Sequence, residues 1–134
     1  MSMFNIFEIS GSGISAQSKR LNVVASNLAN ADSAADSATN VYRAHQVVFQ
    51  TLPGKDKGEN GVKVSKIVED TTPPRRVHDP ANPMAAEDGY VTYPNVNAVE
   101  EMVNMISASR SYQSNVEVLN TTKSLLSKTL QLGS

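Results

Sequence analysis

The sequence predicts a mainly α-helical protein, in which helices at the two ends pack as a coiled-coil-like hairpin and a small β-rich, proline-containing segment lies between them. The chain from Asn95 to Leu132 contains neither proline nor glycine, so it can form one uninterrupted helix. All six prolines lie between Pro53 and Pro94, which excludes a long helix from the middle of the chain. We therefore divide the sequence into an N-terminal core helix with a flexible start (residues 1–31), a loop and small β-rich insert (32–94) and a long C-terminal core helix (95–134).

The first of these blocks carries a short helical pattern. Ile14, Leu21 and Leu28 are one heptad apart, which is the spacing of residues on one face of a helix. Gly11-Ser12-Gly13 interrupts the pattern, so we expect a helix over residues 14–31 with a serine as its N-cap. The residues before it are polar, broken by glycine and close to the chain end, and we expect them to be mobile.

The middle block has the composition of loops and strands. Residues 32–40 are Asp, Ser, Ala, Thr and Asn, which is typical of a loop. Residues 42–50 are rich in β-branched and aromatic side chains and predict a strand. After a turn-rich stretch at 53–61, the alternation of apolar and polar residues over 62–67 predicts a second, half-exposed strand.

The C-terminal block carries the clearest pattern in the chain. Asn97, followed by Glu100 three residues later, is a variant of the capping box and predicts the helix start. Beyond it, steps of four and three trace a seam in which eight of ten positions are apolar: Ala98, Met102, Met105, Ser109, Tyr112, Val116, Leu119, Lys123, Leu126 and Leu130. The N-terminal helix is about half as long, so the rest of this seam requires a neighbouring chain.

Composition excludes several classes of protein. The net charge is −1 and no basic stripe is present, which argues against a nucleic-acid partner. There is no cysteine, so neither a disulfide nor a thiolate site is possible. No run approaches 18 consecutive apolar residues, so we expect no membrane insertion. The first residues lack the basic and continuous apolar regions of a secretory signal peptide.

The search for catalytic or metal-binding residues finds no candidate. His45 and His78 are the only histidines, and neither has another histidine or a cysteine at ligand spacing. Glu100 and Glu101 are better explained as residues that favour a helix N-terminus than as an acid–base pair. We therefore expect no enzymatic activity, no cofactor and no metal.

Amide side chains near the two helical seams are the more informative polar residues. Asn27 and Asn30 lie three residues apart among small residues, and Gln113 and Asn115 have similar surroundings in the long helix. One interpretation is a solvated helix face. The other is close helix–helix packing, in which buried amides fix the register of the contact, as a buried asparagine does in coiled coils.

These stretches also carry a resemblance to a known family. The chain resembles the bacterial flagellar basal-body rod proteins, and among them the C-type subunits of the proximal rod. The similar segments follow one another in the expected order and together extend over nearly the whole chain except residues 51–76. They are Ala25-Ser26-Asn27-Leu28-Ala29-Asn30-Ala31, Tyr42-Arg43, Asp79-Pro80-Ala81-Asn82-Pro83, Gly89-Tyr90-Val91, Pro94-Asn95-Val96-Asn97, Glu101-Met102-Val103 and Ser109-Arg110-Ser111-Tyr112-Gln113-Ser114-Asn115. One departure is the sequence before Tyr42, where Thr39-Asn40-Val41 stands in place of the usual Thr-Pro-Gly.

The resemblance implies a structural role. Rod proteins polymerise through their terminal helices into the shaft that transmits motor torque, so the implied partners are further copies, other rod proteins, the flagellar base and the type III export apparatus. The implied location is the periplasm-spanning rod of the basal body, reached without a cleaved signal peptide. The alternative from the residues alone is a cytosolic coiled-coil adaptor or export chaperone, because the seam fits that class equally well.

We hypothesise that apolar residues of the N-terminal helix pack on the C-terminal seam, and that the amides fix register within and between subunits. The predicted subunit-packing residues are Ile14, Leu21, Val24, Asn27, Leu28, Asn30, Met102, Met105, Tyr112, Gln113, Asn115, Val116, Leu119 and Leu126.

Overall fold

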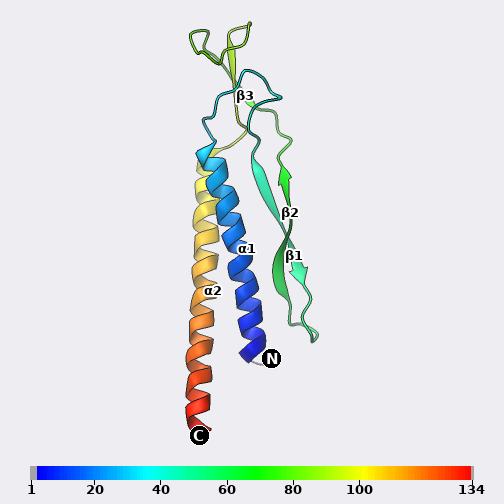
Figure 1. The fold of residues 1–134 in the computed structure, drawn as a ribbon, viewed down its shortest axis with the longest axis vertical. Coiled ribbons are helices and arrows are strands. Elements are labelled where there is room, and N and C mark those ends of the chain that lie inside the picture. Colours follow the sequence, from blue (N-terminus) through cyan, green and yellow to red (C-terminus); the bar gives the residue numbers. More distant parts are fainter. Residues whose placement is uncertain (1–2, 134) are drawn as a thin grey trace. The chain divides into compact units, whose positions relative to one another are not determined.

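The computed structural model describes residues 3–133, which form two long helices and two two-stranded sheets (Figure 1). In chain order the elements are α1 (Met3–Ala29), β1 (His45–Leu52), β2 (Gly61–Glu69), β3 (Arg75–His78), β4 (Tyr90–Tyr93) and α2 (Ala98–Leu132). The terminal helices and the small antiparallel β middle segment are thus confirmed, although the fold is a mixture of helix and sheet rather than mainly helical. Coiled-coil-like packing of the two helices stays a prediction.

The chain forms two compact units. The first contains residues 1–21, 47–66 and 106–134, and the second contains residues 22–46 and 67–105. The units are therefore discontinuous in sequence, and α1, α2 and the β1–β2 hairpin each contribute to both. The three-block division made from the sequence follows chain order and stays a prediction.

The predicted start of the first helix is wrong. Helix α1 begins at Met3, eleven residues before Ile14, and passes through both glycines of the Gly11-Ser12-Gly13 stretch. A Cβ atom added at Gly13 would lie 2.8 Å from the Asn115 side-chain amide of α2, so glycine allows this close approach. The Ser12 hydroxyl donates to the Ile9 carbonyl at 2.7 Å and accepts from the Val62 N–H at 3.1 Å. Tertiary contacts of this kind offset the weak helix propensity of glycine.

The long helix begins where its cap predicts. Helix α2 starts at Ala98, because the Asn97 side-chain oxygen accepts hydrogen bonds from the N–H groups of Val99 and Glu100 at 3.1 and 3.2 Å. The helix continues to Leu132, where the Gly133 N–H donates to the Thr129 carbonyl. The predicted N-cap is confirmed.

The most covered positions of α2 differ from the predicted seam. Its two fully buried residues are Ala108 and Thr122, which directly precede the predicted positions Ser109 and Lys123. Four predicted seam residues are half-buried at heptad spacing, namely Met105, Tyr112, Leu119 and Leu126. In contrast, the side chain of Met102 is 54% exposed. Small residues therefore occupy the innermost positions, where short side chains allow close approach of a neighbouring element.

Both strands predicted in the middle block are present. The first lies over β1 and the second over β2, and Figure 1 shows the two running in opposite directions as one hairpin. Strand β1 starts three residues later than predicted, because the backbone of Ala44 and the residues before it is bonded elsewhere, as described below. Both strands are largely exposed in this chain.

The second hairpin was not predicted. Strands β3 and β4 pair antiparallel, with Arg75 opposite Tyr93 and His78 opposite Tyr90. The connecting turn needs Gly89, whose φ is +81° and whose added Cβ would lie 3.1 Å from the His78 ring. Strands of only four residues, with prolines close by, give too weak a periodic signal to be recognised from sequence.

Strand β4 also fixes the predicted loop at residues 32–40. The N–H and carbonyl groups of Ala35 and Thr92 exchange two hydrogen bonds, of 2.8 and 3.1 Å, as an isolated antiparallel bridge. Val91 and Pro94 are, with Asn27, the largest fully buried side chains of the described residues. The core of the second unit is therefore built around β4 and the end of α1.

Candidate functional site: an asparagine clamp around Ala44 and His45

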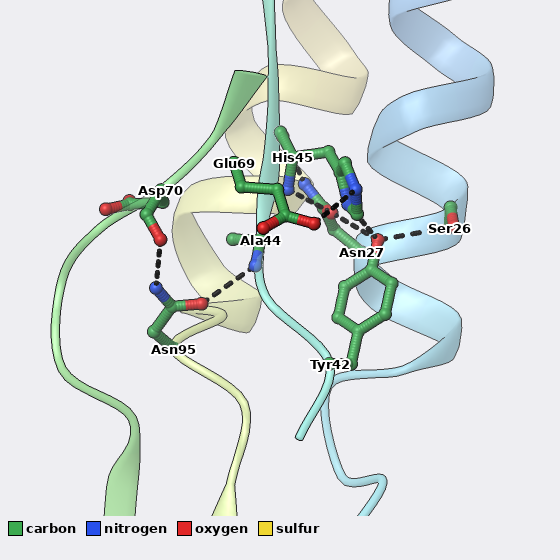
Figure 2. Close-up of polar contacts among 8 residues, drawn as sticks. All are labelled: Ser26, Asn27, Tyr42, Ala44, His45, Glu69, Asp70 and Asn95. Atoms are coloured by element: carbon green, nitrogen blue, oxygen red, sulfur yellow. Dashed lines mark hydrogen bonds and ion pairs between the residues drawn. The ribbon is translucent and has the colours of Figure 1, made fainter. Parts of the chain in front are cut away.

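Two asparagine side chains, from segments far apart in the chain, bind the backbone where β1 begins. Asn27 comes from the end of α1 and Asn95 from the segment before α2, and both contact the Ala44–His45 dipeptide (Figure 2). We call these four residues the asparagine clamp. All of them belong to the second unit.

Asn27 bonds to both polar backbone groups of one residue. Its Oδ1 accepts from the His45 N–H at 2.9 Å, and its Nδ2 donates to the His45 carbonyl at 2.8 Å. The side-chain amide thus reproduces the paired hydrogen bonds of a β-bridge. Because Asn27 is only 1% exposed, these bonds satisfy a polar group that would be costly to bury without partners.

Asn95 joins the same point to the end of β2. Its Oδ1 accepts from the Ala44 N–H at 2.8 Å, while its Nδ2 donates to the carbonyls of Asp70 and Thr72 at 3.1 and 2.9 Å. The Asp70 N–H also donates to the Ala44 carbonyl at 2.8 Å. One neutral side chain therefore connects three segments without placing a charge among them.

Tyr42 and Ser26 add a second layer of hydrogen bonds. The Tyr42 hydroxyl donates to Asn27 Oδ1 at 2.8 Å and lies 3.3 Å from the Ser26 hydroxyl. It also lies 3.1 Å from Nδ1 of His45, and the two rings stack at a tilt with centroids 5.2 Å apart. These contacts fix the orientation of the Asn27 amide (Figure 2).

The carboxylates at this site lie on its exposed side. Glu69 Oε1 is 3.7 Å from Nε2 of His45, and Gln46 donates to the Asp70 carboxylate at 3.2 Å. The hydroxyl and then the backbone N–H of Thr72 bond to the same Asp70 carboxylate, and these bonds lower its pKa. The acidic groups thus stabilise the turn after β2, while neutral amides form the buried part.

The other predicted amides are placed differently. Asn30 and Asn115 each donate to a carbonyl of their own helix four residues earlier, at Ser26 and Ser111 respectively. Gln113 is exposed. Of these four predicted residues, Asn27 is the one whose side-chain amide bonds to a distant segment of the chain. The role of all four between subunits stays a prediction.

The predicted apolar residues of α1 divide into two groups. Val24 is 4% exposed and belongs to the core. Ile14, Leu21 and Leu28 are half-buried, as is Val116 of α2. Their contacts with neighbouring subunits likewise stay predictions.

Sequence reasoning missed His45, which belongs to the clamp, and Glu69, which lies beside it. His45 has no histidine or cysteine near it in sequence, and its partners are residues 27, 42 and 69. Only the motif asparagines and Tyr42 gave a signal, through the family resemblance. No spacing rule relates them, because they meet only in the folded chain.

The chemistry of the site is that of a structural joint. Within residues 3–133, no three His, Cys, Asp or Glu side chains are grouped so that they could hold a metal ion. A small, half-open pocket of the first unit, about 60 Å³, lies beside Ile9, Ser12 and Pro53. No helix in the described part of the chain has the length and apolarity needed to cross a membrane.

Comparison with known proteins identifies the family. A family model described as "Flagella basal body rod protein" matches residues 7–35, and one described as "Flagellar basal body rod FlgEFG protein C-terminal" matches residues 87–132. The flagellar basal-body rod protein FlgC of Yersinia enterocolitica is 60% identical over 99% of both chains. The proteins of the same name from Salmonella typhimurium and from Buchnera aphidicola of Acyrthosiphon pisum are 56% and 50% identical, over 99% and 98% of both chains.

This chain belongs to the FlgC family. The resemblance seen in the sequence is therefore confirmed, and the alternative of an adaptor or chaperone has no support among these relatives. FlgC proteins are named as basal-body rod proteins and not as enzymes. The two family models cover Asn27 and Asn95, which are the two asparagines of the clamp.

Proposed function

We propose that this FlgC-family chain is a structural subunit of the proximal rod, which polymerises through its terminal helices and transmits motor torque. The observation that carries the proposal is the exposed apolar surface of α2. Val99, Met102 and Val103 are 71%, 54% and 60% exposed, and their spacing places them on one side of the helix. A free chain gains nothing from such a surface, whereas a polymer buries it.

The asparagine clamp supports the mechanical part of the proposal. It ties the end of α1, the start of β1, the end of β2 and the segment before α2 to one dipeptide through short hydrogen bonds. A load on one of these segments is then shared by several bonds in parallel. The hydrogen bonds are directional, so they resist a change of angle better than apolar contacts do.

The proposed partners are further copies of this chain, other rod proteins and the flagellar base. Contacts between different surfaces of identical subunits propagate as an open helical array, which is the geometry a shaft requires. We further propose export by the flagellar type III apparatus without a cleaved signal peptide, and a final location in the periplasm-spanning rod. The absence of cysteine suits a chain that crosses a channel unfolded.

The assembly surface is tested with Met102→Asp and the matched control Met102→Leu. Because Met102 is more than half exposed, the aspartate leaves the chain's own fold intact and charges only the proposed contact. We expect Met102→Asp to abolish swimming while its circular dichroism spectrum stays unchanged, and Met102→Leu to swim normally. Normal swimming by the aspartate variant would contradict assembly through this surface.

The location is tested by immunoblotting purified hook–basal bodies and the soluble cytosolic fraction of cells with a tagged copy. Enrichment in the basal bodies, at the mass of the full chain, supports an exported subunit whose signal is not cleaved. A signal confined to the cytosol would contradict the proposed location.

A further inference from the structure

We propose that the asparagine clamp holds His45 in the same way whether its ring is neutral or charged. Nδ1 carries a proton in both states, and only Nε2, which faces outward, gains or loses one. The clamp then keeps every hydrogen bond in both the neutral and the charged state of the ring. The number of hydrogen atoms at the site determines which atom donates and which accepts at each contact.

The orientation of Asn27 is determined by the backbone. The His45 N–H can only donate, so the atom 2.9 Å from it must be the amide oxygen. The His45 carbonyl can only accept, so the atom 2.8 Å from it must be the amide nitrogen. A flipped amide would place like groups together at both contacts.

The direction of the Tyr42 hydroxyl follows from this orientation. Its oxygen lies 2.8 Å from Asn27 Oδ1, which has no hydrogen atom to offer. The single phenolic proton must therefore point at Asn27. The Tyr42 oxygen can then only accept from its other neighbours, Ser26 Oγ at 3.3 Å and His45 Nδ1 at 3.1 Å.

The histidine tautomer follows in turn. Because Tyr42 has no second proton, the contact with His45 Nδ1 is a hydrogen bond only if the ring nitrogen donates. The competing tautomer would place its proton on Nε2, 3.7 Å from Glu69, beyond hydrogen-bond distance and at an exposed carboxylate. It would also leave two acceptor lone pairs, on Nδ1 and on the Tyr42 oxygen, facing each other beside the buried Asn27 amide, so the Nδ1–H form is preferred.

Protonation of the ring adds a hydrogen atom at Nε2 and leaves Nδ1 unchanged. The charged groups near the His45 ring are Glu69 and Asp70 at the end of β2 and Arg43 before β1. The phenol of Tyr42 is a further titratable group in contact with the ring. From α1 and from the segment before α2, the groups that contact the clamp are the neutral Ser26, Asn27 and Asn95. The new proton therefore points toward Glu69 and away from the amide that holds the backbone.

Long-range ¹H–¹⁵N correlation spectra of the folded full chain test the assignment, since they distinguish protonated from unprotonated ring nitrogens. His78 is the only other histidine and serves as an internal reference. We expect neutral His45 to show a protonated Nδ1 and an unprotonated Nε2. A neutral ring protonated at Nε2 would overturn the proposal.

Three variants separate the causes. Tyr42→Phe removes the acceptor and should shift neutral His45 toward the Nε2–H form, whereas Tyr90→Phe, beside His78, should leave His45 unchanged. Glu69→Gln lies on the exposed side and should also preserve the Nδ1–H form. If the tautomer of neutral His45 does not respond to Tyr42→Phe, or if it changes in Glu69→Gln, the assignment of the proton to Nδ1 by the Tyr42 acceptor is wrong.

Amide exchange provides the second readout. After correction for intrinsic exchange, protection of the His45 and Ala44 amides should change by less than about twofold between the neutral and the charged state of the His45 ring, each identified in the same ¹H–¹⁵N spectra. A loss of protection in either state would show that the clamp depends on ring charge and would overturn the proposal.

Discussion

Asn27 and Asn115 have the same side chain and lie in similar sequence surroundings, yet the structure uses them in opposite ways. The Asn27 amide leaves its helix and bonds to both backbone groups of His45. The Asn115 amide donates to the carbonyl of Ser111 in its own helix and packs where Gly13 of α1 approaches. The first is a connection between segments and the second is a space-filling contact, so chemical type alone does not reveal the role of a helical asparagine.

The largest expected effect is the loss of the Asn27 amide. Asn27→Ala leaves the N–H and carbonyl groups of His45 without these partners, and should lower the free energy of unfolding by about 2–4 kcal/mol. Asn115→Ala removes only a bond within one helix and should cost less than about 1 kcal/mol. Urea unfolding followed by circular dichroism measures both. Equal losses would show that the two asparagines do not differ as described.

A slightly smaller effect is expected at the other side of the clamp. Asn95→Ala removes the acceptor for Ala44 and the donor for Asp70 and Thr72, and should cost about 2–3 kcal/mol. Because Asn27 and Asn95 bind adjacent residues, the double variant should lose less than the sum of the single losses. Strict additivity in the same urea experiment would argue that they act independently.

The packing contact is tested at Gly13. Gly13→Val places a branched side chain where a Cβ already lies 2.8 Å from the Asn115 amide, and should cost about 1–3 kcal/mol. Combining it with Asn115→Ala should recover part of this loss, because the clashing group is then absent. Gly11→Val is the matched control, since an added Cβ at Gly11 meets nothing within 4 Å. A loss at Gly11 as large as at Gly13 would assign the effect to helix propensity instead.

The smallest effect should come from an exposed ion pair, which provides a contrast with the buried neutral amides. The guanidinium of Arg76 donates to Asp88 at 2.6 Å, and with the Tyr90 N–H it lowers the pKa of that carboxyl group. Stabilisation is therefore present above the unfolded pKa of about 3.9 and is lost as the pH falls through the folded value.

Asp88→Asn should weaken the acid dependence of the β3–β4 hairpin and leave its stability at pH 7 little changed, as is usual for exposed pairs. Amide exchange of β4 at pH 3 and pH 6 measures this, with Glu87→Gln as the neighbouring control. An unchanged pH dependence in Asp88→Asn would show that this pair does not contribute.

Local signals in the sequence predicted the elements well where one segment contains the whole signal. The Asn97 cap, the proline-free C-terminal helix and the two strands of the first hairpin all depend on residues within a few positions of one another. The α1 start failed because the two glycines lower helix propensity locally, while the contacts that support them come from Asn115 and Val62. The β3–β4 hairpin failed because its strands are too short for periodicity to appear.

By itself, the sequence determined that a helix lies at each end of the chain, the β character of the middle segment and the membership of a rod-protein family, because propensity, periodicity and ordered motifs are properties of the linear chain. Only the tertiary structure decided that Asn27, Asn95, Tyr42 and His45 form one site, and that Ala108 and Thr122 rather than their predicted neighbours are fully buried. The physical reason is that hydrogen bonding of an amide and burial of a small residue depend on what lies opposite them in space, and the partners here are supplied by segments up to fifty-one positions away.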